Sequence, residues 1–162
     1  FGGVLAAGFD AVVNERANRM RWPKGRRRYD LAIALELPVF RPRRYELVLD
    51  GRRHETEAML VAIGNGRSYG GGMQVTPDAE FDDGLLDLLV VEPVSRLEFV
   101  RIFPRVFSGT HLSHPKVRVE RAARVEIASA GIVGYGDGDP SLEGPRHRLW
   151  LDPDGWRYER TT

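Results

Sequence analysis

The sequence contains no cysteine, so neither a disulfide framework nor a thiolate metal site can form in it, and a reducing compartment suits it. No apolar run approaches the roughly 20 residues that a membrane-spanning helix needs, and no basic-then-apolar signal segment is present. The chain has 162 residues, the length of one domain, and a hydrophobic fraction of 42%, which argues against disorder.

Net charge is also nearly absent, at +1, but the charges are segregated along the chain. Arginines crowd positions 21–53 and include the run Arg26, Arg27 and Arg28, whereas acidic residues gather at 78–98 and 137–154. The basic run fits either a solvated face or a surface that docks on anionic lipid headgroups, where each basic residue contributes about 1 kcal/mol. Nucleic acid is the less favoured partner, because aromatic residues are not interleaved with the basic ones.

Local patterns predict a mainly β protein with two helices. One helix is expected over 11–20 with Asp10 as its N-cap, and the other begins at a Ser95–Glu98 capping box and is kinked or ended by Pro104. Residues 31–37 suit either helix or strand, and Asp50-Gly51 predicts a hairpin turn. Short β-like runs separated by turns at 45–57 and beyond 117 indicate a sandwich or a barrel.

The organising stretch runs from Gly64 to Asp87 and is rich in glycine and acidic residues. Short aliphatic runs at 59–63 and 85–91 flank it, as expected of two buried strands. Three consecutive glycines, Gly70 to Gly72, suggest a tight turn or a close approach by another group. The stretch has neither the Lys-Ser/Thr of a P-loop nor a following helix, so a phosphate-binding loop is not indicated.

Two acidic turns and a histidine pair are the remaining candidates for chemistry. The first turn suits a hard cation such as Mg²⁺ or Ca²⁺, although its spacing alone favours a solvated turn; its acids are Asp78, Glu80, Asp82, Asp83 and Asp87. The second holds Asp137 and Asp139, which by themselves fit a hairpin turn better than a proton acceptor. His111 and His114 lack a third ligand at zinc-site spacing, which favours a structural role.

Taken together, the motifs resemble a known family. They occur in order as Gly8-Phe9-Asp10-Ala11, 61–67 running into 69–73, Pro77-Asp78-Ala79, 82–87 and Asp137-Gly138-Asp139-Pro140. This ordered set resembles the C-terminal domain of bacterial diacylglycerol kinases and sphingosine kinase-like lipid kinases, which are related in fold to NAD kinase. Residues 109–117 are similar to the actinobacterial members. The resemblance implies a β-sandwich.

The resemblance also implies a division of labour with a second domain. The family carries a Gly-Gly-Asp-Gly-Thr nucleotide motif in an N-terminal domain, and Gly2-Gly3-Val4 lacks its aspartate. The chain also opens at Phe1 without an initiator methionine. Residues 1–162 are therefore interpreted as one β-rich C-terminal domain of a longer kinase, inactive by itself, with ATP bound mainly by the absent domain.

Site residues follow from the resemblance, position by position. Asp83, with backbone oxygens of Glu80 and Leu85, is expected to hold a structural Mg²⁺. Asp139 stands where the family has a glutamate proposed as the base, and Asp137 could share that role. The loop that lines the substrate cleft would include Asn65, Gly70, Gly71, Gly72 and Met73.

The expected activity is ATP- and Mg²⁺-dependent phosphorylation of diacylglycerol or a related lipid. The protein would then be cytoplasmic and peripheral at the inner membrane face, with Arg26, Arg27 and Arg28 toward the membrane and a homodimer left open. Two alternatives remain. One is a non-catalytic β-sandwich module that binds lipid or membrane, and the other is a NAD kinase-like enzyme acting on a soluble hydroxyl compound.

Overall fold

The structure is a computed structural model that describes residues 4–68, 73–130, 133–136, 139–143, 146–152 and 155–160. Its helices are α1 (Phe9–Arg19), α2 (Arg26–Glu36) and α3 (Arg96–Ile102), followed by the 3₁₀ turns η1 (Phe103–Ser108) and η2 (Thr110–Ser113). Its strands are β1 (Val4–Gly8), β2 (Arg43–Leu49), β3 (Arg52–Ala58), β4 (Leu60–Gly64), β5 (Leu86–Val91), β6 (Val117–Ala122), β7 (Arg124–Ala128), β8 (Val133–Gly136), β9 (Asp139–Glu143), β10 (Arg146–Asp152) and β11 (Gly155–Arg160).

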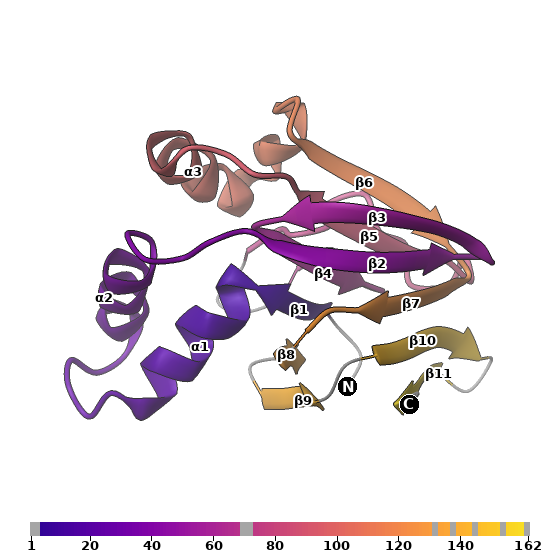
Figure 1. The fold of residues 1–162 in the computed structure, drawn as a ribbon, viewed down its shortest axis with the longest axis horizontal. Helices are drawn as coiled ribbons and strands as arrows, with labels where there is room; N and C mark the ends of the chain where they lie inside the picture. The colour runs from indigo at the N-terminus through magenta and orange to yellow at the C-terminus, as the bar shows by residue number, and fades with distance from the viewer. Residues whose placement is uncertain are drawn as a thin grey trace.

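The strands form two antiparallel sheets. The six-stranded sheet has the order β6-β5-β4-β1-β8-β9, and the five-stranded sheet has the order β11-β10-β7-β2-β3. The helices gather at one side of the molecule, with α1 and α2 at the lower left of the view and α3 at the upper left (Figure 1). The predicted mainly β sandwich is confirmed, with three α-helices among the described residues in place of two.

One hydrophobic core lies between the sheets. Alternate residues of β5 take part in it, because successive side chains of a strand point to opposite faces. Leu86, Leu88 and Val90 thus join the inward residues of β1 and β4 on one side and of β2 and β7 on the other. Tyr45 on β2 is the largest fully buried side chain among those described, and burial raises the pKa of its hydroxyl to about 12.

A second core lies between the six-stranded sheet and the helices. Leu89 and Val91, the other face of β5, pack there with residues of α1, α2 and α3. Phe9 of α1 meets Phe99 of α3 edge-on, with ring centroids 4.7 Å apart, and meets Phe40 in the same way at 5.2 Å. These aromatic contacts connect α1 with α3 and with the segment that follows α2.

The N-cap predicted for α1 is wrong. Gly8 caps the helix with a φ of 95°, and no side chain bonds to the free amides, so Asp10 lies within the first turn. There Asp10 Oδ2 accepts a hydrogen bond from Asn14 Nδ2 at 2.9 Å. A Cβ on Gly8 would lie 2.6 Å from the carbonyl oxygen of Met59, so glycine is required where the chain turns directly from strand to helix.

Other local predictions hold. Ser95 and Glu98 form the capping box that opens α3, and the α-helix ends at Ile102, before Pro104, which lies in η1. Asp50 and Gly51, with φ of 48° and 84°, make the turn between β2 and β3. Residues 31–37, for which the sequence left helix and strand open, fall within α2 apart from the C-cap Leu37.

Candidate functional site

The glycine-rich stretch connects two neighbouring strands. β4 and β5 pair antiparallel, with Gly64 opposite Asp87, so the connection leaves and re-enters the six-stranded sheet at one end of the pair. Of the residues predicted to line a substrate cleft, Gly70, Gly71 and Gly72 lie outside the described residues. Asn65 is buried, and its Oδ1 has no hydrogen-bond partner within the described part of the chain. Met73 is partly buried against the helix-side core.

Thr76 anchors the connection over the end of β4. Its Oγ1 donates to the carbonyl oxygen of Gly66 at 2.8 Å, and its amide donates to the carbonyl of Arg67 at 3.3 Å. Arg67 Nε in turn donates to the carbonyl of Ala79 at 3.2 Å. A Cβ on Gly64 would lie 2.3 Å from Thr76 Oγ1, so Thr76 sits directly against the backbone there. No sequence pattern indicates this role of Thr76.

An ion-paired cluster lies beside this loop. Asp87 on β5 stands opposite Arg121 on β6, and its side chain is 2% exposed. Arg121 Nε lies 3.5 Å from Asp87 Oδ1, and Arg121 Nη2 pairs with Asp83 Oδ2. Asp83 Oδ1 accepts a hydrogen bond from the amide of Leu85 at 2.9 Å. Arg121 thus bridges one buried and one loop carboxylate.

The carboxyl group of Asp87 has a shifted pKa. Burial raises the pKa of its carboxyl above the usual range, the nearby carboxylates of Asp83 and Asp78 add to the increase, and Arg121 opposes it. Its Oδ2 is buried and has no hydrogen-bond partner among the residues described. An unsatisfied buried carboxylate oxygen is costly and attracts a cation or a proton.

These residues fit the predicted metal site in part. Within the described residues, no group of three or more His, Cys, Asp or Glu side chains is arranged to hold a metal ion. The predicted ligand set contains only one carboxylate, Asp83, together with backbone oxygens of Glu80 and Leu85, so it would not form such a group. The unpartnered oxygen of Asp87 beside Asp83 is the observation that favours a cation at this place.

The predicted base lies on a different strand. Asp139 begins β9, an edge strand of the six-stranded sheet, and pairs with Gly136 of β8. Asp137 lies outside the described residues. The structure describes the backbone of Asp139, so its role stays a prediction.

The histidine pair is held within the fold. His111 is 2% exposed, its Nε2 lies 3.1 Å from the carbonyl oxygen of Val75, and its Nδ1 is buried without a hydrogen-bond partner in the part described. Burial is the largest cause that lowers the pKa of His111. The carbonyls of Val75 and Arg105 raise this pKa, but by less. His114 Nδ1 accepts a hydrogen bond from the amide of Lys116 at 3.2 Å. Both geometries agree with the structural role expected from the sequence.

The basic run lies at the start of α2. Arg27 is exposed, Arg28 is half-buried with its guanidinium carbon 5.7 Å from the centre of the Tyr29 ring, and the side chain of Arg26 is outside the described set. Trp22, in the connection between α1 and α2, is 80% exposed. No helix among the described residues is long and apolar enough to cross a membrane.

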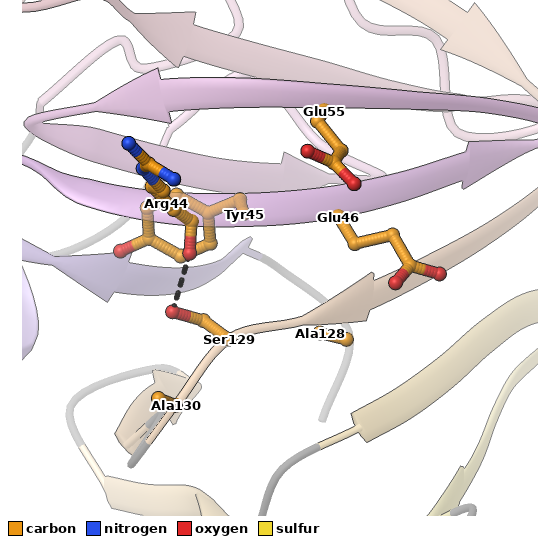
Figure 2. A pocket seen from close by; sticks show the side chains of 7 residues that line it. All are labelled: Arg44, Tyr45, Glu46, Glu55, Ala128, Ser129 and Ala130. Carbon is orange, nitrogen blue, oxygen red and sulfur yellow. Dashed lines mark hydrogen bonds between the residues drawn. The ribbon is translucent and has the colours of Figure 1, made fainter.

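A pocket of about 340 Å³ opens on the five-stranded sheet, where Ser129 donates to the carbonyl of Arg44 at 2.7 Å (Figure 2). It is lined by Arg44, Tyr45, Glu46, Glu55, Ala128, Ser129 and Ala130. None of the predicted site residues that the structure describes lines it. No sequence motif predicts a site there, and the mixed small, acidic and basic lining of the pocket indicates no particular chemistry.

The fold and the glycine-rich connection define a class of protein. Residues 3–153 match the YegS C-terminal NAD kinase beta sandwich-like domain, and the chain belongs to this family. The resemblance drawn from the motifs is therefore confirmed.

Similar full-length proteins are lipid kinases by name. A diacylglycerol kinase of Mycobacterium tuberculosis strain H37Rv is 46% identical over 140 residues, which are 86% of this chain and 45% of that protein. A diacylglycerol kinase of Bacillus subtilis strain 168 is 30% identical over 91 residues, 56% of this chain and 30% of that protein. The chain thus spans less than half the length of these relatives.

Solved structures share the fold. A Bacillus anthracis strain Sterne protein assigned to the diacylglycerol kinases superposes with a TM-score of 0.62 at 20% identity, covering 90% of this chain and 48% of that one. A second structure of a diacylglycerol kinase from that strain gives a TM-score of 0.53 at 18% identity, with 90% and 44% covered.

Proposed function

We propose that this chain is the C-terminal half of an ATP- and Mg²⁺-dependent lipid kinase that phosphorylates the hydroxyl of diacylglycerol or a related lipid. The observation that carries the proposal is the 46% identity, over 86% of this chain, to a protein named diacylglycerol kinase. The partial coverage of that relative supports an active site shared with a second domain, which would bind most of the ATP. The soluble-acceptor alternative is less favoured, because the similar proteins are named for a lipid.

In the proposed reaction, the lipid hydroxyl oxygen attacks the γ-phosphorus of ATP. The bond between that phosphorus and the bridging oxygen breaks, ADP leaves, and the hydroxyl proton passes to the carboxylate of Asp139, with Asp137 as the alternative acceptor. Because positioning and charge neutralisation supply most of the catalysis of phosphoryl transfer, one well-placed carboxylate suffices as the acceptor. The loop from Asn65 to Met73 would line the cleft in which the acceptor is held.

Mg²⁺ would be held by Asp83 and by backbone oxygens of Glu80 and Leu85. Bound there, the cation would supply positive charge that fastens the glycine-rich loop to the start of β5. Asp87, buried next to this position, would be stabilised by the same charge.

The first experiment measures transfer of labelled phosphate from ATP to diacylglycerol in mixed micelles. It compares the full-length protein with the 1–162 chain and includes Asp139→Ala, Asp137→Ala and, as a matched control, Glu55→Ala, an exposed acid on the five-stranded sheet. We expect phosphatidic acid only from the full-length protein, and turnover in Asp139→Ala lower by about 10²-fold or more with the melting temperature unchanged.

Near-normal turnover in Asp139→Ala would remove this residue from the mechanism and leave Asp137 as the acceptor to test. If the full-length protein phosphorylated none of several lipids, the kinase assignment would fail and the lipid-binding module would replace it.

One observation favours the alternative of a non-catalytic lipid-binding module, and it is equally compatible with a lipid kinase. Trp22, a large apolar side chain, is 80% exposed, and the exposed basic residues Arg21, Lys24 and Arg27 surround it in sequence. An exposed aromatic among basic side chains suits the interface of an anionic membrane. On this basis we propose that the connection between α1 and α2 docks on the membrane, with Arg26 and Arg28 beside it, which would make the protein peripheral at the cytoplasmic face.

Co-sedimentation with vesicles tests the docking surface. Trp22→Ser and Arg27→Gln should each lower binding of the full-length protein to vesicles of phosphatidylcholine and phosphatidylglycerol, and added salt should weaken only the arginine contribution. Arg53→Gln, on β3, is the control and should bind as the wild type does. Equal binding by all variants would refute this surface.

A further inference from the structure

We propose that Arg121 is a built-in counter-cation that binds Asp83 when no metal is present and must release it when a divalent cation binds. The inference rests on the proposed metal site at Asp83, and it adds a residue that sets the affinity of that site. In this view the guanidinium and the metal compete for the same carboxylate oxygen.

The position of Arg121 suits such an exchange. It stands opposite Asp87 in the register of β5 and β6, and its guanidinium reaches both Asp87 Oδ1, at 3.5 Å, and Asp83 Oδ2. The side chain of Arg121 is 45% exposed, whereas those of Asp83 and Asp87 are 19% and 2% exposed. The guanidinium of Arg121 is therefore the most exposed of the three charged groups, and in the proposed exchange its side chain turns toward solvent while the backbone register of β5 and β6 is kept.

The charges within the cluster do not balance. Asp83 and Asp87 together carry two negative charges when ionised, the nearby carboxylate of Asp78 adds to them, and Arg121 supplies one positive charge. The imbalance is located at Asp87 Oδ2, which is buried and has no hydrogen-bond partner in the described part of the chain. A divalent cation in place of the guanidinium would neutralise both carboxylates, whereas a monovalent one leaves a buried charge uncompensated.

Simultaneous binding of both cations is unfavourable for a geometric reason. Asp83 Oδ1 already accepts a hydrogen bond from the amide of Leu85, so Oδ2 is the oxygen with fewer commitments within the loop. That oxygen is the one paired with Arg121. Mg²⁺ approaches its ligands to about 2.0–2.1 Å, and a guanidinium on the same oxygen would repel it at close range.

The test is metal binding by the full-length protein without nucleotide. Mn²⁺, a stand-in for Mg²⁺ that electron paramagnetic resonance detects, is titrated into the wild type, Arg121→Gln and Asp83→Asn. We expect Arg121→Gln to bind Mn²⁺ about 10-fold more tightly, in the range of ordinary coupling between two ligands, and Asp83→Asn to lose this binding. The melting temperature of metal-free Arg121→Gln should fall, and the increase produced by Mn²⁺ should be larger than in the wild type.

Arg118→Gln is the matched control, because Arg118 lies on the same strand, is 38% exposed and pairs with Glu92 and Glu120 instead. This substitution removes the same charge but leaves the ion pair between Arg121 and Asp83 in place. The Mn²⁺ affinity of Arg118→Gln should therefore change far less. If Arg121→Gln does not fold without metal, Arg121→Lys serves in its place, since one ammonium cannot span both carboxylates.

The outcomes separate the two proposals. Mn²⁺ bound by the wild type and lost in Asp83→Asn, but bound no more tightly by Arg121→Gln than by Arg118→Gln, would overturn the exchange and leave the metal site intact. Equal Mn²⁺ binding by the wild type and Asp83→Asn would overturn both the site and the exchange, and the kinase assay would still decide the activity.

Discussion

The two faces of the six-stranded sheet pack in cores that contain different kinds of side chain. Among the described residues, the core between the six-stranded and the five-stranded sheet is aliphatic apart from Tyr45, which β2 of the five-stranded sheet contributes. The face toward the helices carries aromatic contacts and the buried polar residues. All the buried polar or charged residues within the described set belong to the helices, to the glycine-rich connection or to the helix-facing side of β5: Asn14, Glu36, Asn65, Thr76, Asp87 and His111.

This difference separates stability from chemistry. Buried polar groups cost free energy unless they are paired, so a chain that keeps them on one face and excludes them from the other concentrates the cost in one place. The inter-sheet core can then be optimised for packing alone. The proposed site lies where the polar residues are, at the end of β4 and β5.

The largest expected effect comes from adjacent residues on β5 that point to opposite faces. Leu88 is fully buried between the sheets, and Leu89 is equally buried under the helices. We expect Leu88→Ala to lower the free energy of unfolding by about 4 kcal/mol and Leu89→Ala by about 2.5 kcal/mol, because helices can shift to fill a cavity more easily than paired sheets can. Urea unfolding of both variants measures the difference. A larger loss in Leu89→Ala would reverse our view of which core is the stiffer.

A loss of stability smaller than that of Leu88→Ala is expected at Gly8, where the chain passes from β1 directly into α1. Gly8→Ala should cost about 3 kcal/mol, because φ is 95° and the new Cβ would meet the Met59 carbonyl at 2.6 Å. Gly51→Ala is the control in the β2–β3 turn: its φ is 84° but nothing lies within 4 Å, so it should cost only about 1 kcal/mol. Similar losses in thermal unfolding of the two variants would show that the close approach at Gly8 is relieved by local movement.

Helix capping supplies a third comparison. Ser95→Ala removes the side chain that accepts from the Glu98 amide and should cost about 1 kcal/mol. Ser129→Ala, beside the five-stranded sheet, removes one exposed hydrogen bond to Arg44 and should cost about 0.5 kcal/mol. Chemical denaturation resolves the two if done in parallel, and a greater loss for Ser129 would contradict the capping argument.

The smallest expected effect is a dependence of stability on pH, caused by the buried His111 of η2. Because burial lowers the pKa of His111, the folded state favours the neutral ring, while the unfolded chain takes up a proton near pH 6.5. The contribution of His111 to stability is therefore fully present above about pH 6.5. This contribution is lost as the pH falls toward the lower pKa of the folded state. Melting temperatures between pH 5 and 8 should show this decline in the wild type and a shallower one in His111→Gln. Parallel profiles would remove His111 as the cause.

The sequence predicted the parts of the fold that depend on nearby residues. The strands flanking the glycine-rich connection, the Asp50-Gly51 turn and the Ser95 capping box were all predicted and observed. For residues 31–37 the sequence fits both helix and strand, because Leu31, Ile33 and Leu35 alternate as in a strand; in the structure 31–36 lie in α2, which contacts α1. The sequence places the N-cap of α1 at Asp10, because it does not reveal that the chain enters the helix from a buried strand through Gly8.

The candidate site was predictable only where its residues are close in sequence. Asp83 and Asp87 stood out as acids after a glycine-rich loop. Arg121 did not, because it reaches them only through the register of β5 against β6. Thr76 was equally hidden, since its role depends on the absence of a side chain at Gly64.

The position of β1 has a consequence for how the domain assembles. This strand is the first described element of the chain, yet it lies in the interior of the sheet, where Leu5 pairs with Ile63 on one side and with Gly136 on the other. Contacts between residues so far apart close long loops, which slows folding relative to helical proteins of similar size. During synthesis, one edge of β1 has to wait for almost the whole domain to emerge, so a nascent chain would expose an apolar strand edge that chaperones or the ribosome surface must protect.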